Sequence, residues 1–167
     1  MRILIVTQYF WPENFRINDL CGELAQRGHN VTVLTGKPNY PGGVVFDEYK
    51  QNPSSFNQYQ GCEVVRVPVI ARGGGASTKL ILNYVSFALS ASLFGLIKLR
   101  KKEFDVIFVF EPSPITVGLP AICFKALNNI PIVFWVLDLW PDTLEAVGVI
   151  KSKKSFVAIR KVSFFYL

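Results

Sequence analysis

The chain has 167 residues, the length of about one domain, and half of these residues are hydrophobic. Its formal net charge of +6 and isoelectric point near 9.3 indicate an anionic partner, for which nucleic acid, acidic lipid and a nucleotide are the candidates. The only histidine, His29, follows Gly28 at a predicted helix-to-strand turn, which excludes histidine-based catalytic triads and histidine metal sites.

In chain order, apolar runs that predict strands alternate with segments that predict helices. We expect strands at residues 2–6, 30–35, 61–68, 104–110 and 131–137, and helices at 14–28, 79–102 and 115–128 and from residue 143. The strands are continuous apolar runs, so both faces of the sheet should be covered and the strands parallel. The predicted fold class is α/β, a Rossmann-like, doubly wound parallel sheet.

The first predicted loop, Thr7–Glu13, is rich in aromatic residues and leads into the N-terminus of a helix, where anions are favoured. In doubly wound sheets, ligands bind beyond the carboxyl ends of the strands. The alternative is that the loop aromatics only close the core. The candidate substrate-binding residues here are Gln8, Tyr9, Trp11, Glu13 and Arg16, the last of which could meet a phosphate or pair with Glu13.

Carboxylates follow two later strands as well, which a doubly wound sheet would bring to the same edge. Asp138 comes directly after a buried strand and could act as a base or bind a sugar hydroxyl, or it could cap the following helix. Glu111, before Pro112, should point into the same cleft. Asp138 and Glu111 are therefore the candidate catalytic residues, Trp140 is a further candidate for stacking on a sugar, and Asp142 fits a helix cap better.

Two common nucleotide-binding patterns are missing. No Gly-x-Gly-x-x-Gly follows the first strand, where Asn14, Phe15 and Arg16 stand instead, and this argues against a dehydrogenase. The glycine-rich segment Arg72–Thr78 lacks the Gly-Lys-Ser/Thr of a phosphate-binding loop. The three cysteines have no metal-ligand spacing and predict buried reduced thiols, which fit a cytosolic compartment.

The segment Leu80–Ile97 contains no charged residue, and its length is about the shortest with which a helix can span a membrane. It lies between two strands of one sheet, so we expect a buried or interface-lying helix rather than a spanning one. Basic residues beside apolar helix favour peripheral attachment to an acidic membrane; the alternative is ordinary solvated helix ends. The expected membrane contacts are Lys98, Arg100, Lys101 and Lys102, with Lys153 and Lys154 later in the chain. Nucleic-acid binding has only the charge in its favour, because no aromatic platform accompanies the lysines.

Three stretches together resemble the N-terminal domain of family 4 glycosyltransferases: Met1–Glu13, Leu24–Thr35 and Pro38–Gly43. The first loop and the sequence Asp-Leu-Trp-Pro-Asp at 138–142 are similar to the WbuB-like branch, which builds bacterial O-antigen and capsule repeat units.

The resemblance implies a GT-B enzyme with two Rossmann-like domains that face a cleft, and retention of anomeric configuration without a metal or other cofactor. Residues 1–150 would form the acceptor-binding domain, and residues 151–167 would begin a basic and apolar helix before a donor-binding domain that this chain lacks. The implied partners are a nucleotide-sugar, a lipid-linked sugar acceptor and an anionic membrane surface, at the inner face of the cell membrane. We therefore expect the chain to be part of a longer protein.

One family feature is missing from the chain, and one apparent match to the family is accidental. Many family members have paired glycines in the first loop, whereas this chain has Asn14-Phe15-Arg16, which makes Arg16 a candidate substitute for that phosphate contact. The spacing of Glu103 and Glu111 matches a glutamate pair of the donor domain, but the two residues flank a buried strand, so we take that match as accidental. A non-catalytic, membrane-associated binding or scaffold protein of the same fold remains the alternative function.

Overall fold

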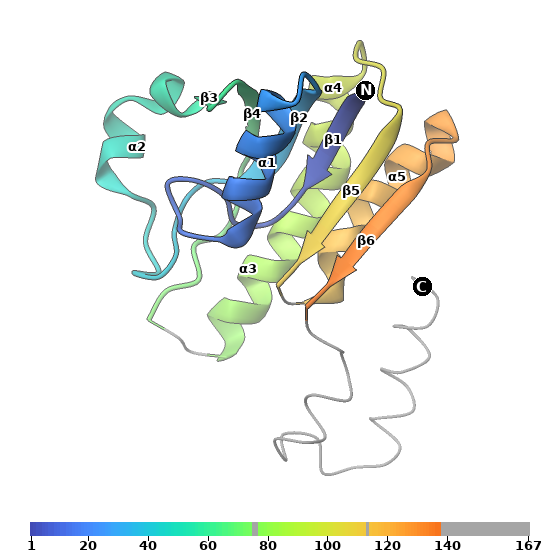
Figure 1. Cartoon of the computed structure of the whole chain (residues 1–167). Helices are drawn as coiled ribbons and strands as arrows, with labels where there is room; N and C mark the ends of the chain where they lie inside the picture. The colour runs from blue at the N-terminus through green and yellow to red at the C-terminus, as the bar shows by residue number, and fades with distance from the viewer. Residues whose placement is uncertain (75–76, 113, 138–167) are drawn as a thin grey trace, which may run out of the picture.

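The computed structural model describes residues 1–74, 77–112 and 114–137, and these form one twisted sheet with helices on both faces (Figure 1). The strand order is β3-β4-β2-β1-β5-β6. β1 pairs in parallel with β2 on one side and with β5 on the other, and β4 and β6 extend the parallel sheet outward. The predicted fold class is confirmed. The strands are β1 (Arg2–Val6), β2 (Asn30–Gly36), β3 (Gln58–Tyr59), β4 (Cys62–Val67), β5 (Val106–Glu111) and β6 (Ile132–Val136).

The edge strand β3 corrects the prediction of a purely parallel sheet. It pairs antiparallel with β4, with Gln58 opposite Glu63. The turn between them contains Gln60 and Gly61, both with positive φ, so the two strands form a tight hairpin after residues 47–57, a segment for which the sequence predicts no strand or helix. That segment also contains the short helices α2 (Asp47–Gln51) and η1 (Pro53–Phe56).

The longer helices divide between the two faces of the sheet. α1 (Arg16–Gln26) lies in front of the sheet in Figure 1, and α3 and α5 lie behind it. Behind the sheet, residues 77–99 form one long helical run with a π-helical segment in the middle. The second helix on this face, α5, is preceded by a 3-10 turn. These elements are α3 (Ser77–Ser90), η2 (Ala91–Gly95), α4 (Leu96–Leu99), η3 (Ile115–Gly118) and α5 (Leu119–Asn128).

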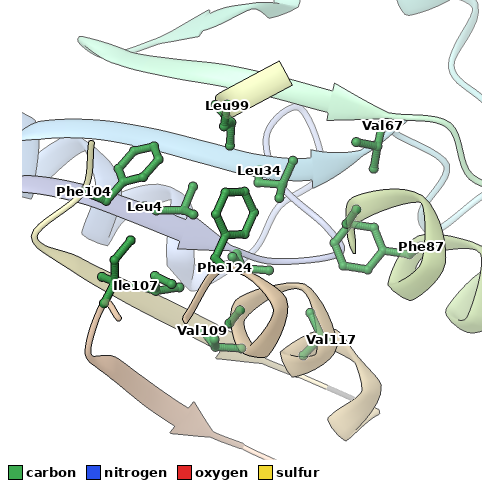
Figure 2. Packing of buried hydrophobic residues seen from close by; sticks show 14 residues of the cluster. Leu4, Leu34, Val67, Phe87, Leu99, Phe104, Ile107, Val109, Val117 and Phe124 are labelled. Carbon is green, nitrogen blue, oxygen red and sulfur yellow. The ribbon is translucent and has the colours of Figure 1, made fainter. Parts of the chain in front are cut away.

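The central strand β1 supplies side chains to both hydrophobic cores. Leu4 and Val6 point to the face covered by α3 and α5, where they pack with Phe87 and Phe124 (Figure 2). The alternate residues of β1 point to the face covered by α1. Successive side chains of a strand point to opposite faces of the sheet, so a strand that is buried on both faces must be apolar throughout. The apolar run of β1 has this pattern.

The connections out of β1 and β5 leave on opposite faces of the sheet. β1 leads into α1 in front, and β5 leads through η3 into α5 behind (Figure 1). The strand order therefore reverses between β1 and β5, and ligands of open α/β sheets bind in the crevice outside the carboxyl ends at such a point.

The helical run Thr78–Leu99 is, among the described helices, the one that is long and apolar enough to cross a membrane by length and composition. Its inner face packs on the sheet, since Phe87 and Ala91 are fully buried in the core. The sequence predicts a buried or interface-lying helix here, and the inner face of the helix is indeed buried against the sheet.

We predict that Phe87→Ala lowers the free energy of unfolding by about 3–5 kcal/mol, because it removes a fully buried ring and leaves a cavity between α3 and the sheet. The matched control is Leu89→Ala, two residues along the same helix, where the side chain is 60% exposed and the expected change is within about 0.5 kcal/mol. Urea unfolding followed by circular dichroism measures both. Equal effects of the two substitutions would contradict the assignment of the inner face.

Candidate functional site

The candidate site lies at the carboxyl ends of β1 and β5, where the register of the strands brings two predicted site residues level with each other. β1 and β5 are in register with Val6 beside Val109. Continuing that register by two residues places Gln8 level with Glu111. The side chains of both are buried, and the backbone carbonyl of Glu111 accepts a hydrogen bond from the N–H of Leu137 at the end of β6.

The first loop is attached to α3 through a fully buried asparagine. Asn83 Oδ1 accepts hydrogen bonds from Gln8 Nε2 at 2.6 Å and from the Tyr9 hydroxyl at 2.9 Å. Asn83 Nδ2 donates to the carbonyl of Ile70 in the segment after β4, at 2.6 Å. One side chain thus joins the ends of β1 and β4. The predicted binding residue Gln8 is part of this internal network.

The aromatic residues of the first loop pack against one another, in contrast to the open stacking faces that the sequence suggested. The Tyr9 ring is 4% exposed and stacks on Phe15 with a centroid distance of 5.4 Å. Tyr40 packs against both rings, and the Arg72 guanidinium lies over the Tyr40 ring. Burial of Tyr9 also raises the pKa of its hydroxyl.

Trp11 belongs to a second aromatic group, at the β3 edge of the sheet. Its ring lies against Phe56 and Tyr59, with centroid distances of 5.1 and 5.3 Å. Because it is only half-buried, part of the indole still faces solvent. Of the two first-loop aromatic residues predicted to bind substrate, Tyr9 and Trp11, Trp11 is the one that retains an accessible surface.

Glu13 is a buried carboxylate that clamps two loops together. One carboxylate oxygen accepts hydrogen bonds from the backbone N–H groups of Asn39 and Tyr40, each at 2.7 Å, and the other accepts from the N–H of Phe10 at 3.1 Å. Burial outweighs these bonds and the nearby Arg66 charge, and raises the pKa of Glu13 from 4.5 to about 7. The predicted substrate contact is thus a link between the loops after β1 and β2.

Arg66, on β4, carries a cation into the same region. Its guanidinium donates to the carbonyl of Gly36 at 2.8 Å and to the carbonyl of Trp11, and lies over the Tyr49 ring. The side chain is buried, and the resulting desolvation lowers the pKa of Arg66 to about 10. Arg66 joins the first loop to the end of β2.

The other predicted site residues lie in two different settings. Arg16 is exposed at the first residue of α1 and is free to meet a ligand. Glu111, the last residue of β5, is fully buried. Among the described residues, no three His, Cys, Asp or Glu side chains gather as a metal site would require. Asp138, Trp140 and Asp142 lie outside the described residues.

The predicted membrane contacts that the structure describes lie at the end of the long helix and just beyond it. Lys98, Arg100 and Lys101 are exposed, and Lys98 donates to the backbone carbonyl of Arg66. Lys102 forms an ion pair with Glu63 on β4. Lys153 and Lys154 lie outside the described part of the chain.

Sequence reasoning did not identify four polar residues that organise this edge. Asn18 on α1 donates to the carbonyl of Glu13 and accepts from the N–H of Trp11, and Asn39 Oδ1 accepts from the N–H of Arg72. Asn83 and Arg66 complete the set. The available signal was a polar residue within an otherwise apolar helix or strand, as at Asn83 and Arg66, since such a residue is buried only with partners.

Comparison with known proteins identifies the family. The model of the glycosyl transferase 4-like domain matches residues 14–160 of the chain. The chain belongs to the glycosyl transferase 4-like family. The predicted relationship to family 4 glycosyltransferases is therefore confirmed at the level of the family. No curated protein sequence matches the chain.

Solved structures with the same fold include glycosyltransferases. The calicheamicin glycosyltransferase CalG4 is 16% identical with a TM-score of 0.58, over 96% of this chain and 40% of that one. The glycosyltransferase of kitacinnamycin is 15% identical with a TM-score of 0.57, over 87% and 34%. The C-terminal domain of a Pyrococcus furiosus hydrogenase also matches, at 13% identity and a TM-score of 0.51, over 80% and 90%. The glycosyl transferase 4-like chain thus spans less than half the length of the two glycosyltransferases, and these likenesses concern the fold alone.

We predict that Asn83→Leu lowers the free energy of unfolding by at least about 1–3 kcal/mol, because the buried amide of Gln8 and the hydroxyl of Tyr9 lose their shared acceptor. Asn128→Leu is the control, since Asn128 is exposed near the end of α5 and its replacement should change stability by less than about 0.5–1 kcal/mol. Chemical denaturation measures both. A neutral Asn83→Leu would show that the network contributes nothing to the attachment of the first loop.

We predict that Glu13 gives the protein a stability that falls as pH rises. Between about pH 4.5 and pH 7, the folded protein holds a proton that the unfolded chain has lost, so the free energy of unfolding decreases across this window by up to about 3 kcal/mol and this contribution is constant outside it. The difference in unfolding free energy between the parent chain and Glu13→Gln, measured from pH 4 to pH 8.5, isolates the effect. Parallel pH profiles of the two proteins would refute the prediction.

Proposed function

We propose that this chain is the acceptor-binding domain of a retaining glycosyltransferase that transfers a sugar from a nucleotide-sugar to a lipid-linked saccharide. The proposed pathway class is the synthesis of bacterial surface polysaccharide such as O-antigen or capsule. The family membership supports transferase chemistry. The WbuB-like branch, the lipid-linked acceptor and the location at the inner face of the cell membrane are parts of the proposal.

The observation that carries the proposal is the position of Glu111. Glu111 is the last residue of β5, and extending the β1–β5 register by two residues places it level with Gln8, at the point where the strand order reverses. A carboxylate at a crevice of this kind can accept the proton of an acceptor hydroxyl or hold that hydroxyl in place.

Arg16 and Asp138 complete the proposed site. Arg16 is exposed where the first loop enters α1, so its guanidinium is available to a phosphate oxygen of the donor or of the acceptor lipid. Asp138 comes two residues after β6 in the sequence and is assigned to the same edge as a base or hydroxyl ligand. Trp11 offers the half-buried aromatic surface for a sugar ring.

The donor would be bound chiefly by a second domain. The two glycosyltransferases of known structure are more than twice as long as the part that this chain matches. We propose that the protein containing this chain has a second Rossmann-like domain that closes over the crevice and holds the nucleotide-sugar. No metal is assigned a role in the proposed reaction.

We predict that Glu111→Gln lowers kcat by about 10²–10⁴-fold in the complete protein that contains this chain, because the amide cannot take the acceptor proton. Glu103→Gln is the matched control. It changes the same residue type at the opposite end of β5, where the side chain is 81% exposed and pairs with Arg2, and kcat should be unchanged. Radiolabelled transfer to lipid-linked acceptors from a panel of nucleotide-sugars measures the rates.

Two outcomes would contradict the proposal. Unchanged rates in both Glu111→Gln and Asp138→Asn would remove these residues from the site. If the complete protein transfers no sugar from any donor of the panel but binds lipid-linked saccharide, it is a non-catalytic binding protein of the same fold. Unfolding curves of Glu111→Gln, recorded alongside, separate a loss of chemistry from a loss of folding.

A further inference from the structure

The outward face of the long helix behind the sheet is apolar from Ile81 to Ile97. Seven large hydrophobic side chains on α3, η2 and α4 are between 43% and 60% exposed, and we call them the outer stripe. A helix on the surface of a soluble domain normally turns polar side chains to water. The residues of the outer stripe are Ile81, Leu82, Val85, Leu89, Leu93, Phe94 and Ile97.

The π-helical segment η2 keeps the outer stripe straight. Ile81, Val85, Leu89, Leu93 and Ile97 recur every fourth residue, and each such step overshoots a full α-helical turn by about 40°. Over the length of the helix this drift would carry the last residues toward the sheet. The π-helix η2 has more residues in each turn than an α-helix. It therefore rotates the residues that follow it back toward the outer face. Leu93 and Ile97 are accordingly about as exposed as Ile81 and Leu89.

One asparagine and three serine side chains of the same helix bond within the protein. Asn83 and Ser90 donate to backbone carbonyls in the segment after β4, and Ser86 accepts from the N–H of Ile70 there. Ser92 donates to a carbonyl within the helix itself. These four groups are satisfied internally, and every exposed side chain between Lys79 and Lys98 is hydrophobic. The distribution is the reverse of that of a water-facing helix.

The charged residues of the helical run and its two ends, residues 77–102, are all basic. Between Glu63 and Glu103 the sequence contains no acidic residue and seven basic ones. Lys79 lies at the start of α3, and Lys98, Arg100 and Lys101 lie at the end of α4 or just beyond it; all four are exposed and none forms an ion pair with a described residue. A surface that is apolar in the middle and cationic at its ends matches the acyl boundary and anionic head groups of a bilayer.

We propose that the outer stripe is a membrane-binding surface, on which the helix lies flat in the interface of an anionic phospholipid bilayer. The apolar side chains enter the boundary of the acyl region, and the cations at the two ends contact lipid phosphates. The helix does not span, because its other face holds Phe87, Ala91 and Leu99 in the core of the sheet. A second copy of the chain is a poorer occupant, since a two-fold pairing of this surface would bring its cations together.

This inference rests on the proposed function in one respect, because a lipid-linked acceptor is what would make such attachment useful. The helix also connects the two features. Asn83, which holds Gln8 and Tyr9 at the candidate site, lies between Leu82 and Val85 of the outer stripe. Binding the stripe to a membrane would therefore bring the carboxyl edge of the sheet close to the lipid head groups.

The test is vesicle flotation of the chain without any sugar, so its result does not depend on transfer chemistry. We expect binding to vesicles of phosphatidylcholine with a third phosphatidylglycerol, binding at least tenfold weaker to pure phosphatidylcholine, and weakening by salt. The double variant Leu89→Ser with Leu93→Ser should reduce binding at least tenfold. The matched control is Leu127→Ser on α5, where the side chain is 70% exposed, and binding should be unchanged.

Depth measurements test the orientation of the helix. Cys123 is first replaced by Ser, because it is only partly buried and would be labelled. Cys21 and Cys62 are buried and protected from labelling, so they are kept. A fluorophore is then attached to Ile81→Cys, Leu89→Cys or Ile97→Cys and quenched with brominated lipids. We expect the same shallow depth at all three positions, whereas a spanning helix would place the middle position deepest.

Three results would overturn the inference: equal binding of the double variant and the parent chain, no preference for anionic vesicles, or a deep middle position. Sedimentation velocity adds a further discriminating result. A dimer that the double variant abolishes, with no vesicle binding by the parent chain, would identify the stripe as a protein interface. Failure of the transferase assay with intact vesicle binding would leave this inference standing and reject the proposed function alone.

Discussion

The position of β1, paired along both edges and covered on both faces, determines the arrangement of the rest of the molecule. Its neighbours β2 and β5 both run parallel to it, so three chain connections begin at the same edge of the sheet. The connection after β1 leaves toward α1, and the connection after β5 leaves toward α5 on the opposite face. These two connections diverge at the carboxyl ends of β1 and β5, close to Gln8 and Glu111, and ligands of open α/β sheets bind at such a point.

Buried polar groups then fix the shape of that edge. Burying a carboxylate or an amide costs free energy unless its hydrogen bonds are made, so each such group holds its partners firmly. Glu13 holds the loop after β2 to the first loop, and Asn83 holds the first loop to the segment after β4. The first half of the chain therefore offers a pre-formed frame, and exposed or half-exposed residues such as Arg16 and Trp11 are its available contacts.

The long helix behind the sheet has two roles because its two faces differ. Its inner face supplies Phe87 to the core and Asn83 to the polar network, while its outer face is apolar and bordered by cations. The same element thus joins the candidate site to the proposed membrane surface. In a glycosyl transferase 4-like domain with a lipid-linked acceptor, this arrangement would let one rigid helix set the distance between bilayer and crevice.

The sequence by itself determined the order of strands and helices, the parallel sheet and the family, because continuous apolar runs and local motifs record burial directly. The tertiary structure alone decided the polar partners: Gln8 and Asn83 are 75 residues apart, and no local pattern links them. For the same reason, Tyr9 and Glu13 have internal partners where the sequence suggested ligand contacts. The antiparallel β3 depends on a two-residue pairing too short to leave a pattern, and the outward direction of the apolar stripe depends on which face of the helix the sheet already occupies.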